Sequence, residues 1–116
     1  MRIRFVPDGA GVVGAEWKPE PCWEGFRGII HGGIVASVLD EAMSKAVAIQ
    51  CEALTAELRV RFRREIAPGA TFLVRGWIRR RTKRLIETEA TLTSTGGAEH
   101  AHAWAVFLAL SKTREA

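Results

Sequence analysis

The longest regular pattern of apolar residues in the chain runs over residues 31–49. Its apolar side chains recur at three- and four-residue spacing and no proline interrupts them, which predicts an α-helix. These side chains are Ile34, Val38, Leu39, Ala42, Met43, Ala46 and Val47. Because apolar residues cover most of the circumference, we expect this helix to lie in the middle of a domain.

Four later segments alternate apolar and polar residues with the period of two that is typical of β-strands. In the first, residues 55–66, apolar Leu58, Val60 and Phe62 alternate with arginines, so we expect a strand with one face in water. The other three cover residues 72–79, 85–94 and 99–110. The separating segments are Pro68-Gly69, a basic tip at residues 80–84, and Gly96-Gly97. Such short connections favour antiparallel pairing.

The N-terminal quarter of the chain has a weaker pattern. Residues 2–6 and 12–17 are candidate strands on either side of Pro7-Asp8-Gly9, and residues 19–28 look irregular. One long buried helix followed by antiparallel strands predicts an α+β fold in which the sheet wraps around the helix. At 116 residues, with 47% hydrophobic residues, we expect one globular domain over residues 1–116.

The predicted helix does not begin with a Ser, Thr, Asp or Asn that would accept a hydrogen bond from a first-turn amide. We therefore expect those amides to be free. Gly32 and Gly33 let a ligand approach the backbone closely, and the positive end of the helix dipole favours negative charge there. Two interpretations stay open: an oxyanion-binding site, or a glycine pair that only turns the chain into the helix.

Asp40 lies in the middle of this largely apolar helix. Glu41 and Lys45 make an ordinary surface pair four residues apart. Asp40 shares a second polar stripe with Ser37 and Ser44. We expect the first stripe to face solvent and the second to face a pocket. The alternative for Asp40 is a solvated residue on a polar helix face.

Helix geometry separates the glycine amide from the carboxylate. Eight residues at about 1.5 Å each place Asp40 roughly 12 Å along the axis from Gly32. One carbonyl therefore cannot contact both groups of the same chain. If both act on it, the second comes from another copy, most simply through two antiparallel helices about a two-fold axis. This predicts a homodimer with two shared sites.

The chain resembles the hotdog-fold acyl-CoA thioesterases of the phenylacetate-associated, PaaI-like group. That group is marked by His-Gly-Gly and an acid nine residues after the histidine, here His31, Gly32, Gly33 and Asp40. Residues 25–30 and 39–43 also resemble one bacterial branch, and the resemblance covers about residues 23–110. It implies a hotdog fold, an antiparallel sheet around one long central helix, and hydrolysis of acyl-CoA thioesters.

The resemblance also implies roles for single residues. The Gly32 amide would polarise the thioester carbonyl, and Asp40 of the partner subunit would attack that carbonyl or activate water. Ser44 would hold the water and Thr55 would hydrogen-bond near the carboxylate. Gly33 and His31 would support the site, His31 by ordering the loop. No separate cofactor is implied, because coenzyme A is part of the substrate; pairing of dimers into a tetramer stays open.

One position departs from the family pattern. Many members carry Asn or Gln six residues before the histidine, where it helps to position the water or the carbonyl; here this residue is Gly25. The neighbouring Glu24 cannot donate a hydrogen bond when it is ionised. Two other functions therefore stay open: a noncatalytic protein that binds acyl-CoA or acyl chains, and a hotdog dehydratase or hydratase. The second needs a His–acid pair, and the sequence shows no clear one.

The formal net charge of +4 is concentrated in residues 59–64 and 79–84. Three interpretations are open: a solvated strand face and loop, nucleic-acid binding, or recognition of the coenzyme A phosphates by Arg81, Lys83 or Arg84. Nucleic acid is disfavoured because the basic stripe lacks interleaved exposed aromatic side chains, so we expect no nucleic-acid partner.

The remaining candidate sites are weak. Cys22 and Cys51 lack the spacing of metal ligands, so we expect free thiols and no metal. His100 and His102 alternate on the last strand, where a structural role is favoured over a metal pair. No apolar segment reaches the roughly 20 residues of a membrane span. Since no secretory signal is evident either, we expect a cytoplasmic protein.

Overall fold

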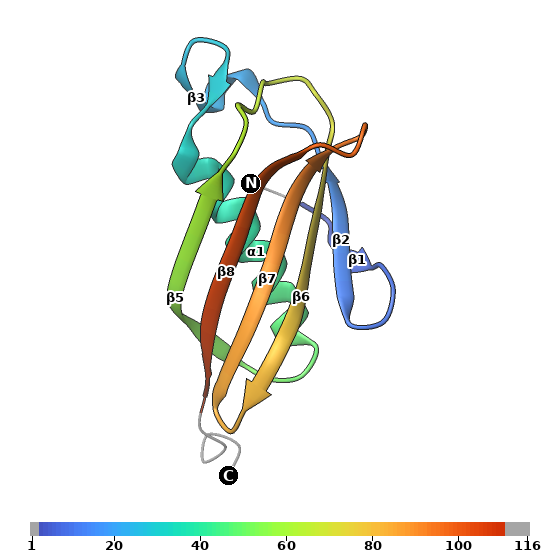
Figure 1. The fold of residues 1–116 in the computed structure, drawn as a ribbon, viewed down its shortest axis with the longest axis vertical. Coiled ribbons are helices and arrows are strands. Elements are labelled where there is room, and N and C mark those ends of the chain that lie inside the picture. Colours follow the sequence, from blue (N-terminus) through green and yellow to red (C-terminus); the bar gives the residue numbers. More distant parts are fainter. Residues whose placement is uncertain (1–2, 111–116) are drawn as a thin grey trace.

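A computed structural model of the chain describes residues 3–110, which form one α-helix, a six-stranded sheet and a separate small hairpin (Figure 1). In chain order the elements are β1 (Val6–Pro7), β2 (Val12–Trp17), the 3₁₀ turn η1 (Pro21–Trp23), β3 (Glu24–Phe26), β4 (Ile29–Ile30), α1 (Gly32–Ala48), β5 (Ala53–Phe62), β6 (Phe72–Thr82), β7 (Leu85–Ser94) and β8 (Glu99–Ala109).

The main sheet is antiparallel, with its strands in the order β1-β2-β6-β7-β8-β5. Tight turns join β6 to β7 and β7 to β8, as their short connections predict. The first of these turns contains Lys83, whose φ of 51° lies in the left-handed region. β5 precedes this meander in the chain but pairs with its last strand, so β5 forms one edge of the sheet.

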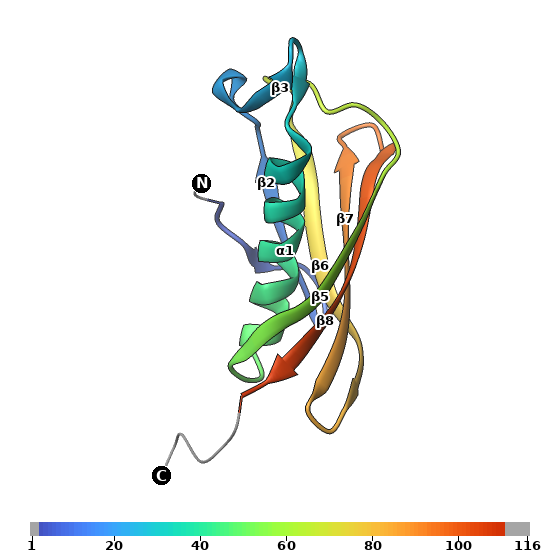
Figure 2. The ribbon, with the colours of Figure 1, turned by 90° about the vertical axis from the view of Figure 1, so that its left-hand side faces the viewer.

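The sheet curves around α1, which lies along one of its faces (Figure 2). The buried residues of the helix are Val35, Val38, Leu39, Ala42, Met43, Ala46 and Val47. They pack against the alternate side chains of the strands, among them Val74, Ile86, Leu92 and Phe107. Gly33, Ser37, Glu41 and Lys45 form the exposed stripe of the helix. The period of 3.6 residues therefore sets which face of α1 enters the core.

Gly76 lets the helix approach the sheet backbone closely. A Cβ atom at this position would lie 2.7 Å from both the carbonyl carbon and the carbonyl oxygen of Ala42. Real Cβ atoms do not come so close to backbone atoms. Because Gly76 has no side chain, α1 can pack closer to the backbone of β6.

The predicted α+β hotdog fold is confirmed. The helix expected over residues 31–49 is observed at Gly32–Ala48, and the last three predicted strands correspond to β6, β7 and β8 within three residues at each end. The strand expected over residues 55–66 ends earlier, at Phe62. It ends there because the amides of Arg63 and Arg64 both donate to the carbonyl of His100.

The prediction that β5 has only one face in water is wrong. Leu58 is 41% exposed and Phe62 is 52% exposed. Their partners in register on β8, Ala105 and Ala101, are buried on the helix side of the sheet. The difference arises because β5 is an edge strand, and within residues 3–110 no further strand pairs with its outer side.

The N-terminal region also differs from the prediction. The strand expected over residues 2–6 is observed only as Val6–Pro7, and residues 1 and 2 lie outside the described residues. The segment 19–28, expected to be irregular, contains η1 and β3. β3 and β4 form a hairpin at the N-terminal end of α1 (Figure 1), directly before His31 and the two glycines in the chain.

Candidate functional site

His31 caps the N-terminus of α1 with its side chain. Its Nδ1 accepts a hydrogen bond of 2.8 Å from the amide of Gly33. Its own amide donates to the carbonyl of Trp23, which ties the helix start to η1. The expectation that the first-turn amides are all free is therefore wrong for Gly33, because histidine supplies the acceptor that Ser, Thr, Asp or Asn would normally provide.

Gly32 keeps an amide without an acceptor. No hydrogen bond from this amide occurs within residues 3–110. It is the first residue of the helix, where backbone amides have no intrahelical partner and the helix dipole is positive. Gly32 also lines a hollow of about 500 Å³ between the β3–β4 hairpin and the end of β5. This volume is within the range of small-molecule sites.

Gly25 packs directly against His31. A Cβ atom on Gly25 would lie 3.3 Å from the Cα atom of His31. This is a tight contact with backbone, which explains why the hairpin runs without a side chain here. Gly25 lines the same hollow as Gly32. Many members of the family that the chain resembles carry an amide side chain at this position. Gly25 has no side chain and thus adds no such donor to the hollow.

Asp40 lies half-buried on α1 and is held by the next strand. The hydroxyl of Thr55, on β5, donates a hydrogen bond of 3.0 Å to Oδ1 of Asp40. The contact forms because α1 and β5 are antiparallel neighbours joined by a short turn. This hydroxyl donor fixes the orientation of the carboxylate.

The two serines of the Asp40 stripe differ in their surroundings. Ser37 is exposed and donates to the carbonyl of Gly33, four residues earlier, at 2.9 Å. Ser44 is half-buried and lines a second hollow of about 570 Å³ beside the C-terminal half of α1. Asp40 is not among the residues that line either hollow. That Asp40 faces a pocket stays a prediction.

The basic tip lies at the other end of the molecule from the β3–β4 hairpin (Figure 1). Arg81 donates to the side-chain oxygen of Gln50 at 3.0 Å. Arg84 donates from two nitrogens to the carbonyl of Ala109. Within residues 3–110, Lys83 has no hydrogen bond or ion pair through its ammonium group. Two of the basic side chains of the tip thus make hydrogen bonds within the chain.

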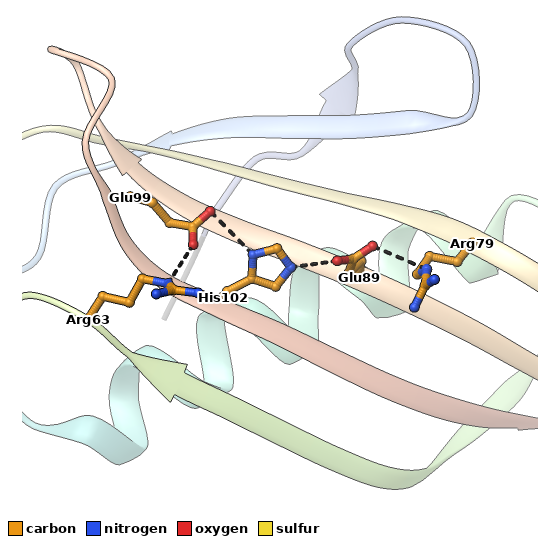
Figure 3. A network of polar contacts seen from close by, with 5 residues as sticks. All are labelled: Arg63, Arg79, Glu89, Glu99 and His102. Atoms are coloured by element: carbon orange, nitrogen blue, oxygen red, sulfur yellow. Dashed lines mark hydrogen bonds and ion pairs between the residues drawn. The ribbon is translucent and has the colours of Figure 1, made fainter.

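The two histidines of β8 have separate partners. Figure 3 shows His102 between Glu89 and Glu99, at 2.6 and 3.2 Å, with Arg79 and Arg63 beyond these acids. Nδ1 of His100 instead lies 2.8 Å from the carbonyl oxygen of Glu65. Within the described residues no group of three His, Cys, Asp or Glu side chains is arranged to hold a metal ion.

Two aromatic side chains beside Gly32 were missed by sequence reasoning. Phe62 was expected to be buried within the sheet, and Phe26 was placed in an irregular segment. In the structure both line the hollow above Gly32, with Phe26 80% exposed. The alternation of residues in β5 places Phe62 on the helix side of the sheet, but only the strand order shows that, within residues 3–110, no further strand lies beyond it.

Two further observations concern the chain as a whole. Cys22 and Cys51 are free thiols. In the part of the chain that the structure describes, no helix has the length and apolar character needed to cross a membrane.

The sequence and the fold both match known proteins. The sequence model of the thioesterase superfamily matches residues 27–101, well over half of the chain. The chain belongs to the thioesterase superfamily. No match is found among curated proteins. The fold of this thioesterase superfamily member is also that of many solved structures.

Three of these structures illustrate the similarity. A thioesterase superfamily protein is 21% identical with a TM-score of 0.87; the match covers 91% of this chain but only 55% of that protein. The protein smu.793 from Streptococcus mutans, solved bound to acetyl CoA, is 20% identical over 97% of this chain and 91% of its own, with a TM-score of 0.86. A mutant of the phenylacetic acid degradation protein PaaI from Thermus thermophilus is 18% identical over 93% of each chain, with a TM-score of 0.85. At these identities the likeness shows the fold.

Proposed function

We propose that this member of the thioesterase superfamily hydrolyses acyl-CoA thioesters in a site shared by two copies of the chain. The observation that carries the proposal is a carboxylate, Asp40, oriented by the Thr55 hydroxyl on a helix whose first residue, Gly32, lines a ligand-sized hollow. An amide donor can stabilise the oxyanion of thioester hydrolysis, and a carboxylate can attack the carbonyl or activate water. The acetyl CoA bound by smu.793 is consistent with this substrate class.

The Gly32 amide donates to the carbonyl oxygen of the thioester and stabilises the negative charge that develops there. Such an oxyanion donor contributes about 10²–10³ in kcat. Asp40 acts in one of two ways. As a general base it takes a proton from water, whose oxygen adds to the carbonyl carbon; the C–S bond then breaks and the proton goes to the leaving thiolate. As a nucleophile it forms an acyl-aspartyl anhydride, releases the thiolate, and water then cleaves the anhydride.

The two groups act on one carbonyl only if they come from different copies. Gly32 and Asp40 both lie on α1, eight residues apart, which is about 12 Å along the axis. Two antiparallel copies of α1 would place Gly32 of one copy beside Asp40 of the other. Gly33, His31, Ser44 and Thr55 would support each shared site.

The edge strand β5 supports such a dimer. It is ten residues long, its outer side is open, and its helix-facing side chains Leu58 and Phe62 are exposed. A long edge strand with exposed apolar residues readily pairs with another strand. If two β5 strands pair antiparallel about Leu58, the sheet becomes continuous and the two copies of α1 run antiparallel on the same side.

The charges of β5 fit this register. Within residues 3–110, Arg63, Arg75, Arg79 and Arg80 each pair with an acid. Arg59 instead lies over the ring of Trp104, and Glu57 has no ion-pair partner in the same range. Pairing about Leu58 places Glu57 of each copy directly opposite Arg59 of the other. Opposite charges at facing positions stabilise a strand pair.

The coenzyme A phosphates are assigned to the basic tip. In the antiparallel dimer the tip of one copy lies toward the same end as Gly32 of the other copy. Lys83, with its ammonium group unpaired within residues 3–110, and Arg81 and Arg84 would then bind the phosphates as they leave the shared site. This assignment follows from the dimer and fails with it.

The proposed activity is tested by release of free thiol from a panel of aryl-, short- and medium-chain acyl-CoAs. We expect wild type to turn over at least one of them and Asp40→Asn to lower kcat by about 10²–10⁴. Glu41→Gln is the matched control, because Glu41 is the next acid along the helix and lies on its exposed stripe. Circular dichroism must show the same melting behaviour for both variants.

The other outcomes are equally informative. Unchanged hydrolysis in folded Asp40→Asn would contradict the catalytic role of Asp40. Acyl-CoA binding without hydrolysis in wild type would support the alternative of a noncatalytic binding protein, which the missing side chain at Gly25 favours. Hydration of an enoyl-CoA would instead indicate a hydratase.

A further inference from the structure

Two aromatic side chains of the hollow above Gly32 have no role in the chemistry described so far. Phe62 ends β5 and Phe26 belongs to the β3–β4 hairpin, so they reach the hollow from two different elements. Phe62 is 52% exposed and Phe26 is 80% exposed. Burying such rings against an apolar ligand is favourable because it removes apolar surface from water.

Phe62 stands next to the amide that would hold the thioester oxygen. A Cβ atom on Gly32 would lie 3.5 Å from Cζ and 3.8 Å from Cε1 of Phe62. These are ordinary van der Waals distances, so the ring of Phe62 is in contact range of a methyl group at the Gly32 Cβ position. An acyl chain whose carbonyl oxygen lies on the Gly32 amide begins beside this ring.

The rest of the hollow combines apolar and charged side chains. Its remaining apolar side chains are Ile29, Ile30, Val35 and Ile66. The charged side chains that line it are Arg63, Arg64 and Glu65. Arg63 is paired with Glu99 at 2.9 Å, and Arg64 and Glu65 carry opposite charges. Two arginines and one glutamate line the hollow, and the charges balance only when Glu99, the partner of Arg63, is counted; this balance favours an uncharged acyl group.

We propose that Phe62 makes the enzyme selective for uncharged acyl groups without a branch at the carbon next to the carbonyl, and that Phe26 covers the far end of the chain. The inference rests on the proposed thioesterase function, because it uses the Gly32 amide as the anchor of the carbonyl. It adds a specificity-determining residue that contacts neither the attacking group nor the coenzyme A phosphates.

The test compares butyryl-CoA with 2-methylpropanoyl-CoA, which have the same atoms and differ only in the branch. We expect wild type to prefer the unbranched thioester by about tenfold or more in kcat/KM, the discrimination that one misplaced carbon produces in a packed pocket. Phe62→Ala should bring the ratio close to one, and Phe62→Leu should give a value in between. Phe26→Ala should lower kcat/KM for both thioesters and leave their ratio unchanged.

A ratio that is the same in wild type and folded Phe62→Ala would overturn the inference. Size-exclusion chromatography with light scattering shows whether the variants keep the assembly state of wild type. If Phe62→Ala changes the assembly state, the test uses the ratio of kcat/KM values for Phe62→Leu instead. A ratio for Phe62→Leu that equals the wild-type ratio would then contradict the proposal.

Binding separates this inference from the proposed function. Calorimetry on Asp40→Asn chains, with and without Phe62→Ala, gives the affinity ratio of the two thioesters without turnover. If wild type hydrolyses neither these two thioesters nor any other acyl-CoA of the panel, the proposed function fails, but a branch-dependent affinity that Phe62→Ala removes still supports the role of Phe62. Equal affinities in both backgrounds would exclude it.

Discussion

His31 determines which amide at the start of α1 is available to a ligand. Its ring nitrogen accepts from Gly33 at 2.8 Å, and its carbonyl accepts from Ile34 and Val35. Among the first four amides of the helix, only that of Gly32 lacks an acceptor within residues 3–110. A helix start normally offers several such donors. Since His31 already accepts from the other three amides, the amide of Gly32 is the one left for a ligand within residues 3–110. Gly32 lies beside Phe62 and lines the hollow.

A side chain at position 33 should disturb this arrangement. A Cβ atom on Gly33 would lie 3.0 Å from Nδ1 and Cε1 of His31, so Gly33→Ala must displace the capping ring. We expect it to cost about 1 kcal/mol of unfolding free energy relative to Gly32→Ala, whose Cβ fits at 3.5 Å from Phe62. Both variants gain the same helix propensity, so their difference isolates the cap.

The measurement is urea unfolding of both variants. Equal stability of Gly33→Ala and Gly32→Ala would show that the hydrogen bond of His31 contributes nothing to the helix start.

At the scale of elements, the contact between α1 and β6 depends on Gly76. A Cβ atom there would lie 2.7 Å from backbone atoms of Ala42, which cannot move independently of the helix. We expect Gly76→Ala to lower the unfolding free energy by about 1–3 kcal/mol through overpacking. Gly96→Ala is the control, because that glycine lies in an exposed turn with only the Ser94 hydroxyl nearby, at 3.9 Å.

Thermal and urea unfolding should show a large loss for Gly76→Ala and a change within about 0.5 kcal/mol for Gly96→Ala. A fully stable Gly76→Ala protein would mean that α1 shifts on the sheet without cost.

The sequence predicts where the helix and strands lie in the chain better than it predicts what covers each of them. Apolar periodicity locates α1, β6, β7 and β8, because each has one face in the core and the period of that face shows in the residues. It does not show that β5 is an edge strand, since Leu58, Val60 and Phe62 alternate as they would in a strand covered on one side. Strand order depends on pairing between distant segments, which no local pattern contains.

The candidate site was also predicted only in part, because a local pattern shows its motif but not the contacts between distant segments. His31, Gly32, Gly33 and Asp40 form a motif with fixed spacing within one element, so they are visible in the sequence. The hydrogen bond from Thr55 to Asp40 was expected from the resemblance and is present. The capping bond of His31 and the position of Phe62 over Gly32 depend on how the loop and β5 meet α1. These contacts are visible only in the structure.

At the scale of the whole molecule, the proposed site needs a second copy of the chain. The open edge of β5, the charges of Glu57 and Arg59, and the separation of Gly32 from Asp40 all support a second copy as the missing half. The proposed dimer would cover Leu58 and add Asp40 to the hollow above the other copy's Gly32. In this account assembly and catalysis depend on the same strand.

The central claim is that each site combines Gly32 of one copy with Asp40 of the other. Asp40→Asn removes the carboxylate, and Gly32→Pro removes the amide hydrogen. Proline is well tolerated at the first residue of a helix, which Gly32 is, so the second variant should keep its fold. Mixed dimers of the two variants then contain one site with both native groups and one with neither.

The most direct measurement is thiol release by mixed dimers, purified through a different tag on each chain, with the two parent variants as controls. We predict about half the wild-type activity per dimer, against nearly none for either parent, because one of the two shared sites is intact. Mixed dimers as inactive as their parents, with both parents folded and dimeric, would contradict the shared site.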